Sequence, residues 1–310
     1  MKALRIVDGI ATLEGAPAPS GDGVLVDVVS TSICGSDLHL IDGGLAEGRV
    51  LGHELAGRTP DGTAVAVEPV GRCGHCVNCE AGHGNHCDSL VAFGIFADGG
   101  MAEQLVVPEA CIHPLPSGVE VSTASVVEPL AVAVHGLHRA RAGAGDRVAV
   151  VGAGPVGLAL VAVCRAEGLV AEVDARHEHQ RAAVERLGGT VGTSGGYDVV
   201  FDAVGSPDSF ATSLAACRPE GRLGLVGSLW EPATIDVGLC LKEVEVLPSM
   251  MYCDRGRSDF VRAAEILARQ SSIASTLLTH RFPLDAAQEA FDVARDRSGG
   301  TIKVAFDISS

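Results

Sequence analysis

Residues 147–168 read RVAVVGAGPVGLALVAVCRAEG, and this stretch decides the fold of the second half of the chain. RVAVVGAG predicts a buried strand followed by a turn, and PVGLALVAVCRAEG predicts a helix. The uncharged run Val148–Cys164 has seventeen residues, including three glycines and a proline. It is slightly too short to span a membrane. We therefore interpret the stretch as a buried strand, a tight turn and a helix.

The alternation of strands and helices continues towards the C-terminus. LVAEVDA predicts a second strand and HEHQRAAVERLGG a second helix, and further strands are expected in YDVVFDAVG, RLGLVGSL and EVEVLPSMM. This alternation indicates a parallel, doubly wound sheet in an α/β protein. After Tyr252, SDFVRAAEILARQ and LDAAQEAFDVARD predict helices and TIKVAFDI a strand. The first 130 residues are instead rich in short β-like runs such as GVLVDVVST and GTAVAVEPV, so a separate domain is expected there.

The turn after the first of these strands carries a glycine pattern that is typical of dinucleotide-binding proteins. Gly152, Gly154 and Gly157 form G-x-G-x-x-G, with Pro155 and Val156 in the second gap. Glycines at these positions allow a tight turn and a close approach of the backbone to a pyrophosphate at the helix N-terminus. The pattern alone is weak, but it stands directly between a predicted strand and a predicted helix.

Asp174 follows Gly157 by seventeen residues, at the end of the next predicted strand. A carboxylate there suits the ribose hydroxyls of the adenosine and repels a 2′-phosphate, so NAD is favoured over NADP. Arg176 leaves an alternative open, because a basic residue just past that strand could receive a phosphate. It could also be a solvated residue at the start of a helix.

Composition excludes several kinds of partner. The formal net charge is −16 and no basic run interrupts it, so neither a nucleic acid nor an anionic membrane surface is an expected partner. The start, MKALRIVDGI, has no apolar signal core, which predicts a cytoplasmic location with reduced thiols. We expect the partner to be a small molecule.

Four of the ten cysteines lie within fifteen residues, in CGHCVNCEAGHGNHC. Cys73, Cys76, Cys79 and Cys87 are spaced three, three and eight apart, which predicts a metal site. Four thiolates close a tetrahedral zinc and leave no position for substrate, so this zinc would brace a loop and do no chemistry. The alternatives are free thiols, or a site in which a nearby histidine replaces one cysteine: His75, His83 or His86.

A second metal site is predicted from three separated segments, ICGSDLH, LGHE and SVVEPLAVAVHG. They contribute Cys34, His53, Glu54 and Glu128. One thiolate, one imidazole and one carboxylate leave a fourth position open on zinc, as a catalytic site requires. Each residue also has an ordinary structural explanation: a small buried thiol, a core histidine, or a carboxylate at a helix start. Their combination on one chain favours the metal site.

The order of these motifs resembles the zinc-dependent medium-chain dehydrogenase/reductase family. CGSDLH, GHE, the four-cysteine lobe, EPLAVAVHG and GAGPVGL follow one another as in that family, and THRFPLDAAQEAF with GGTIKVAF is similar to its C-terminal part. Within the family, CDSL, GGMAEQLVVP, VVEPLAVAVHG and KEVEVLPSMMY resemble the alcohol and polyol branch, of the butanediol and sorbitol dehydrogenase type.

The resemblance implies two domains. A GroES-like, β-rich catalytic domain would consist of residues 1–128 and 255–310, with a zinc lobe at about residues 71–90. A Rossmann domain that binds NAD would occupy residues 129–254. Relatives form dimers or tetramers, so a homodimer or homotetramer is expected.

The resemblance also implies two zinc ions per chain and a set of catalytic residues. Cys34 and His53 would bind the catalytic zinc together with Glu54 or Glu128, and the other carboxylate would lie close to the zinc-bound water. The substrate would bind as a zinc-bound alkoxide. Ser36 would accept its proton and His39 would pass it to solvent.

The chain is shorter than is usual for this family. Only RTPDGTA separates LGHELAG from VAVEPV, and only TVGTSGG separates ERLGG from YDVVFDAVG. We expect the second loss to remove part of the wall near the adenosine, which could weaken cofactor binding or expose a face used for assembly. Phe93, Phe96 and Trp230 could line a substrate pocket or belong to the core.

The predicted function is hydride transfer between a secondary alcohol or polyol and NAD. Two alternatives remain: an NADPH-dependent carbonyl reductase of a biosynthetic pathway, and a non-catalytic nucleotide-binding scaffold. The intact Cys34, Ser36, His53 and Glu128 set argues against the scaffold, which has no need of an open metal site.

Overall fold

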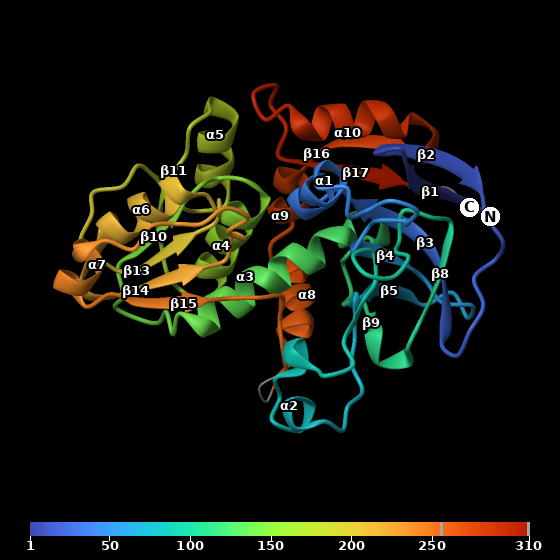
Figure 1. Ribbon diagram of the computed structural model, residues 1–310, viewed down its shortest axis with the longest axis horizontal. Coiled ribbons are helices and arrows are strands. Elements are labelled where there is room, and N and C mark those ends of the chain that lie inside the picture. Colours follow the sequence, from blue (N-terminus) through green and yellow to red (C-terminus); the bar gives the residue numbers. More distant parts are fainter. Residues whose placement is uncertain (255–256, 309–310) are drawn as a thin grey trace. The chain divides into compact units, whose positions relative to one another are not determined.

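The computed structural model describes residues 1–254 and 257–308. The chain forms two compact units, which Figure 1 shows as ribbons. Unit 1 combines Met1–Glu128 with Cys253–Ser310, and unit 2 is Pro129–Tyr252. The chain returns to unit 1 at Cys253, whereas the sequence predicted a boundary at residue 255, which lies outside the described residues. No described helix is both long and apolar enough to cross a bilayer.

Unit 2 contains a six-stranded parallel sheet, which confirms the doubly wound sheet predicted from the sequence. Its elements are β10 (Val148–Val151), α4 (Pro155–Ala166), β11 (Ala171–Asp174), α5 (Glu178–Arg186), β12 (Thr190–Val191), β13 (Tyr197–Asp202), α6 (Pro207–Ala216), β14 (Cys217–Leu225), α7 (Val237–Lys242) and β15 (Glu245–Pro248).

The strand order β12-β11-β10-β13-β14-β15 explains how unit 2 is wound. The chain runs outwards from β10 through β11 to β12, then returns to the other side of β10 to form β13, β14 and β15. Because parallel crossovers are right-handed, helices that follow the two directions cover opposite faces of the sheet. The reversal next to β10 is the point at which open α/β sheets bind ligands.

Unit 1 is built around a seven-stranded sheet of mainly antiparallel strands. Its elements are β1 (Lys2–Val7), β2 (Ile10–Gly15), β3 (Val24–Ser32), α1 (Gly35–Asp42), β4 (Glu54–Arg58), β5 (Ala64–Val67), β6 (Val70–Gly71), α2 (Val77–Glu80), η1 (Gly84–His86), β7 (Val91–Ala92), β8 (Gln104–Val107), η2 (Glu109–Cys111), β9 (Ile112–Pro114), η3 (Val121–Val126), α8 (Asp259–Arg269), α9 (Ser272–Leu277), β16 (Leu278–Pro283), η4 (Leu284–Ala286), α10 (Ala287–Arg295) and β17 (Lys303–Asp307). The helix α3 (Val127–Arg139) starts in unit 1 and continues into unit 2.

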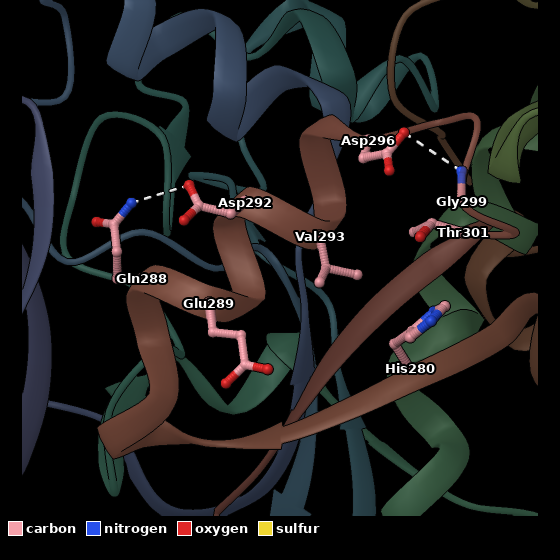
Figure 2. Close-up of a pocket in the computed structure, with 8 residues that line it drawn as sticks. All are labelled: His280, Gln288, Glu289, Asp292, Val293, Asp296, Gly299 and Thr301. Carbon is pink, nitrogen blue, oxygen red and sulfur yellow. Dashed lines mark hydrogen bonds between the residues drawn. The ribbon is translucent and has the colours of Figure 1, made fainter.

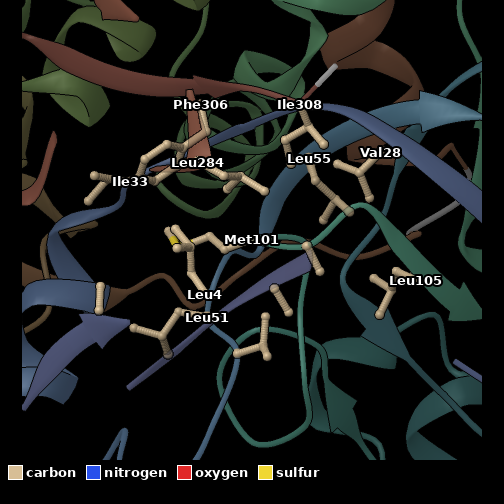
Figure 3. Packing of buried hydrophobic residues seen from close by; sticks show 14 of the residues in the cluster. Leu4, Val28, Ile33, Leu51, Leu55, Met101, Leu105, Leu284, Phe306 and Ile308 are labelled. Atoms are coloured by element: carbon tan, nitrogen blue, oxygen red, sulfur yellow. The ribbon is translucent and has the colours of Figure 1, made fainter. Parts of the chain in front are cut away.

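The long strand β3 holds unit 1 together. It pairs antiparallel with β17, β4 and β8, so segments from the two ends of the chain meet on it. Figure 3 shows the apolar cluster of this unit, in which Leu4 and Met101 come from the first third of the chain and Phe306 from its last strand. All three are at most 1% exposed. This rigid sheet fixes the ends of β3, β4 and β17 relative to one another.

A cluster of polar residues in unit 2 packs against the short TVGTSGG segment. Tyr197 is fully buried, its hydroxyl donates to Glu172 over 2.6 Å, and it accepts from the backbone N–H of Ser194 over 2.7 Å. The Arg147 guanidinium stacks over the Tyr197 ring at 4.8 Å and bonds to Glu172 and Ser194. These contacts hold the short TSGG segment against β11 and β13.

We expect Tyr197→Phe to destabilise unit 2, because the Ser194 N–H loses its partner and Glu172 loses a donor. A loss of about 1–2 kcal/mol is expected, which corresponds to a fall in Tm of about 3–8 °C. Thermal unfolding followed by circular dichroism measures the change. The exposed Ser275→Ala in unit 1 is the control; if both variants melt like the parent, the cluster does not stabilise the shortened segment.

Candidate functional site

The four cysteines predicted to bind metal come together in a lobe around α2. Their sulfur atoms all lie within 4.8 Å of one another, and the Sγ of Cys73 lies 3.6 Å from that of Cys87 and 4.0 Å from that of Cys79. A tetrahedral zinc with Zn–S bonds of about 2.3 Å requires sulfur separations of about 3.8 Å. The group consists of cysteines alone, without His75, His83 or His86.

The electrostatics of the lobe also fit a bound cation. Backbone N–H groups of Cys73 and Ser89 donate to the Cys87 sulfur, and such bonds lower the pKa of that thiol. Backbone N–H donors, chiefly at Asp88, lower the pKa of Cys76 to about 6. Desolvation raises the pKa of Cys79 to about 12. Adjacent thiols cannot all ionise without a cation between them, and a zinc ion would allow it.

A buried ion-pair network ties the lobe to the body of unit 1. The Arg72 guanidinium, next to Cys73, bonds both to Glu68 and to Asp254. The Glu68 side chain is 2% exposed, and its second oxygen lies 2.8 Å from Nε2 of His113 on β9. Burial lowers the pKa of Arg72, but the Glu68 and Asp254 carboxylates outweigh it and raise that pKa.

The second predicted metal site is assembled at strand ends. Cys34 is the N-cap of α1, two residues after β3 ends, and His53 directly precedes β4. Cys34, His53 and Glu54 each offer a donor atom within 4.8 Å of the others. The register explains this convergence, because Ser32 at the end of β3 lies opposite Glu54 at the start of β4.

Glu54 is held on two sides. The Lys303 ammonium donates to both of its oxygens, over 2.7 and 2.6 Å, and the Ser32 hydroxyl donates to Oε2. The Lys303 and Glu54 side chains are each 1% exposed. Burial lowers the pKa of Lys303, but the charges of Glu54 and then of Cys34 outweigh it and raise that pKa. Lys303 therefore forms a buried ion pair with one of the candidate ligands, Glu54.

The His53 ring lies next to the carboxylate of Asp37, a residue of α1. One Asp37 oxygen accepts from the Cys34 N–H, while the other lies 3.4 Å from His53 Nδ1. Burial lowers the pKa of His53, but the charges of Asp37 and Cys34 outweigh it and raise that pKa well above its usual range. The negative charges of Asp37 and Cys34, which favour a proton on the His53 ring, would also favour a divalent cation bound to it.

Glu128, the second residue of α3, is buried at 8% exposure and interacts electrostatically with His53 and Glu54, but it is not one of the three residues whose donor atoms lie within 4.8 Å of one another. Burial raises the pKa of its carboxyl to about 8, and the charge of Glu54 adds to the rise, against opposing effects of His53 and Lys303. Burial thus favours the neutral form of this carboxyl, and a metal cation beside it would favour the charged form. The donor set of one thiol, one imidazole and two nearby carboxyls therefore fits a zinc ion.

The predicted proton-transfer residues lie on α1. The Ser36 hydroxyl is half-buried and lies 3.3 Å from His53 Nε2. His39 is exposed and lies three residues further along the same helix, so both side chains are on one face. Helix α1 thus extends from Ser36, beside the buried His53 imidazole, to the solvent-exposed His39.

In unit 2 the glycine turn has the shape that a dinucleotide site requires. Gly152 has φ = 97°, and a Cβ on Gly157 would lie 1.9 Å from the Gly152 carbonyl oxygen, so neither position tolerates a side chain. The Gly152 N–H bonds to the carbonyl of Asp174, which places the end of β11 beside the turn. Pro155 starts α4. Arg176 is exposed just beyond β11.

A separate cavity of about 550 Å³ in unit 1 contains none of the predicted site residues. Figure 2 shows it beside α10, with Gln288 donating to Asp292 and the Gly299 N–H to Asp296. Its lining residues are His280, Gln288, Glu289, Asp292, Val293, Asp296, Gly299 and Thr301. Two of its carboxylates are thus used in bonds within the chain.

The three aromatic residues considered for a substrate pocket differ in how far they are buried. Phe93 is partly buried and packs on the core of unit 1. Phe96 is 67% exposed and Trp230 is 50% exposed, so neither belongs to a core.

Three residues beside the candidate ligands were not predicted from the sequence. Asp37 lies within the CGSDLH motif and Lys303 within GGTIKVAF, but nothing in either motif states which side chain it contacts. Ser32 precedes the first motif and carries no signal of its own. The contacts follow from the pairing of β3 with β4 and β17.

Family models match two parts of the chain. The model described as "Alcohol dehydrogenase GroES-like domain" matches residues 20–117, and the model described as "Zinc-binding dehydrogenase" matches residues 155–269. The fold of unit 1 and unit 2 is thus the GroES-like and Rossmann-type fold that the sequence predicted.

Curated relatives match over most of their length. L-galactonate-5-dehydrogenase of Escherichia coli (strain K12) is 30% identical, and the match covers 89% of each chain. Probable D-xylulose reductase A of Arthroderma otae is 31% identical, covering 95% of this chain and 94% of the relative.

Solved structures agree with these matches. An E. coli CFT073 protein described as a short chain alcohol dehydrogenase, complexed with NADH, has a TM-score of 0.87 at 26% identity and covers 99% of both chains. A putative zinc-binding dehydrogenase from Sinorhizobium meliloti 1021, bound to NADP, has a TM-score of 0.86 at 28% identity, covering 99% of this chain and 98% of that one.

We expect Arg72→Met to loosen the cysteine lobe, because it leaves the buried Glu68 carboxylate without its guanidinium. The expected cost is about 3 kcal/mol. It is measured as a lower Tm and as faster thermolysin cleavage beside the exposed Val77. Arg218→Met, which removes an exposed pair with Asp198, should change neither. Equal behaviour of the two variants would contradict an anchoring role for Arg72.

Proposed function

Because the chain belongs to the zinc-dependent medium-chain dehydrogenase/reductase family and is therefore an oxidoreductase, we propose that it transfers hydride between a secondary alcohol or polyol and NAD. The observation that carries this proposal is the convergence of Cys34, His53 and Glu54 in unit 1. Relatives named for L-galactonate and D-xylulose support a small, hydroxyl-rich substrate.

We assign the catalytic zinc to unit 1 and the cofactor to unit 2. The ligands of that zinc are Cys34, His53 and one carboxylate. Glu54 offers an oxygen within 4.8 Å of donor atoms of Cys34 and His53, whereas both of its oxygens also accept bonds from Lys303, so Glu128 stays the alternative carboxylate ligand. A second zinc belongs to the four cysteines of the lobe, where it has a structural role because no coordination position is left.

Each group has a defined part in the reaction. Zinc would supply a Lewis acid that lowers the pKa of a substrate hydroxyl, and NAD would accept the hydride. The Asp37 carboxylate, 3.4 Å from His53 Nδ1, would orient the ring so that Nε2 can bind the metal. Ser36 Oγ accepts the hydroxyl proton, because a hydroxyl can donate and accept at once. The exposed His39 then carries the proton to solvent.

The cofactor is proposed to bind at the turn after β10, with its pyrophosphate at the N-terminus of α4. The residues assigned to it there are Gly152, Gly154, Pro155, Val156 and Gly157. At the end of β11, the Asp174 carboxylate favours the ribose hydroxyls of NAD.

A second candidate, an NADPH-dependent carbonyl reductase, rests on the basic side chains just past β11. The Arg181 guanidinium bonds to the backbone carbonyl of the exposed Arg176, so a second basic residue lies at this position. The NADP-bound relative shows that proteins of similar fold can accept the 2′-phosphate.

Metal analysis tests the two proposed sites separately. The purified parent should contain two zinc ions per chain and oxidise members of a polyol panel with NAD. Cys34→Ser should keep one zinc, melt within about 2 °C of the parent and lose at least about 100-fold in kcat/KM. Cys76→Ser should lose the other zinc and melt earlier. A parent with one zinc that Cys34→Ser retains, and no turnover, would overturn the proposal.

Cofactor preference is tested by variants at the end of β11. Asp174→Ala should weaken NADH binding by about tenfold and improve NADPH binding, because it removes a bond to the ribose and the repulsion of a phosphate. Arg176→Ala should change NADH binding little. Fluorescence titration with both reduced cofactors measures this. A selective loss of NADPH binding in Arg176→Ala, from a parent that prefers NADPH, would favour the reductase instead.

A further inference from the structure

We propose that Asp202 is a positioning residue for the cofactor: its carboxylate holds the turn that follows β13 against the glycine turn that follows β10. The inference rests on the proposed function, because it assumes that the cofactor binds at the glycine turn. It assigns a role to a buried carboxylate that is neither a candidate metal ligand nor a candidate proton carrier.

The place of Asp202 follows from the register of three neighbouring parallel strands. Asp202 is the last residue of β13, and its partners in the register are Val151, the last residue of β10, and Leu225, the last residue of β14. All three strands therefore end at the same edge of the sheet. The strand order reverses beside β10 at this edge, which is where open α/β sheets bind ligands. Asp202 thus lies between two of the turns that border the proposed cofactor site.

The Asp202 side chain is fully buried, and its bonds organise the turn after β13. Its Oδ1 accepts from the backbone N–H groups of Val204 and Gly205, over 2.9 and 3.0 Å. Its Oδ2 accepts from the hydroxyl of Ser209, in the first turn of α6, over 2.9 Å. Bonds from neutral donors to a buried carboxylate are stronger than bonds between neutral groups. One side chain therefore fixes both the turn and the start of the helix that follows it.

The turn after β13 packs closely against its two neighbours. A Cβ on Gly152 would lie 2.3 Å from Cγ2 of Val204, so the valine covers the first glycine of the glycine turn. A Cβ on Gly205 would lie 2.4 Å from the carbonyl oxygen of Ser228, in the turn after β14. Val204 is nevertheless 42% exposed. It therefore presents an apolar surface beside the place proposed for the cofactor.

Loss of the Asp202 carboxylate would release this turn. The N–H groups of Val204 and Gly205 would lose their shared acceptor, and the valine would no longer be held against Gly152. A site that must be reordered on binding has a lower affinity than one that is held ready. The candidate metal ligands belong to unit 1, so their metal would be retained.

The experiment measures cofactor affinity in the full-length, zinc-loaded protein by fluorescence titration with NADH and with NADPH. Asp202→Ala should weaken binding of the cofactor that the parent prefers at least about tenfold. The KM for its oxidised form should rise by a similar factor, while the zinc content stays that of the parent. Asp202→Asn should retain most of the affinity, since its amide oxygen can accept the same two N–H bonds.

Tyr197→Phe is the matched stability control. Tyr197 is the first residue of β13, at the opposite edge of the sheet, so the variant should lower the Tm without changing cofactor affinity. An equal loss of affinity in Tyr197→Phe and Asp202→Ala, at an equal fall in Tm, would show that Asp202 acts through stability alone and would overturn its positioning role. Ser209→Ala removes one bond to Asp202 and should show a smaller loss of affinity, which keeps the test informative if Asp202→Ala does not fold.

The outcomes separate this inference from the proposed function. A parent that binds neither NADH nor NADPH overturns the proposed function and this inference together. A parent that binds the cofactor, with an Asp202→Ala variant that binds it equally well, overturns the role of Asp202 alone. Unchanged affinity in Ser209→Ala, where Asp202→Ala does not fold, overturns it in the same way.

Discussion

The ion pair between Lys303 and Glu54 is the interaction on which the candidate site depends. Carboxyl groups of Asp37, Glu54 and Glu128 are buried together beside the Cys34 thiol, and burying several like charges is costly unless cations compensate them. The chain supplies a cation at Lys303, bonded to both oxygens of a single carboxylate, and the raised pKa of His53 favours a proton on that ring as well. A divalent metal would balance the remaining negative charge. The need to balance buried charge therefore applies both to Lys303 and to the proposed metal.

The two proposed metal sites differ in how the fold supports them. The cysteine lobe takes its ligands from one short loop, and Arg72 ties that loop to the sheet through the buried Glu68. The second site takes its ligands from the ends of β3 and β4 and from the start of α3. A rigid sheet can hold such separated residues in a fixed geometry, and precise geometry is what a catalytic centre requires.

Much of the fold could be predicted because its signals are local. The run from Val148 to Cys164 specifies a strand, a turn and a helix, and the glycine spacing is explained by the contact between Gly157 and the Gly152 carbonyl. The cysteine spacing is equally local. The cluster around Tyr197 could not be foreseen, because Arg147 reaches it from the residue before β10 and Glu172 from β11.

By itself, the sequence determined which side chains are available: the doubly wound domain, the glycine turn, the four-cysteine lobe, and Cys34, His53, Glu54 and Glu128 as donors. It left open which carboxylate is free for a metal. Only the tertiary structure shows which side chains surround Glu54, because these contacts depend on strand register. Pairing of β17 with β3 and of β3 with β4 brings Lys303 and Ser32 to Glu54 from 249 and 22 residues away along the chain. No local pattern encodes contacts over such separations.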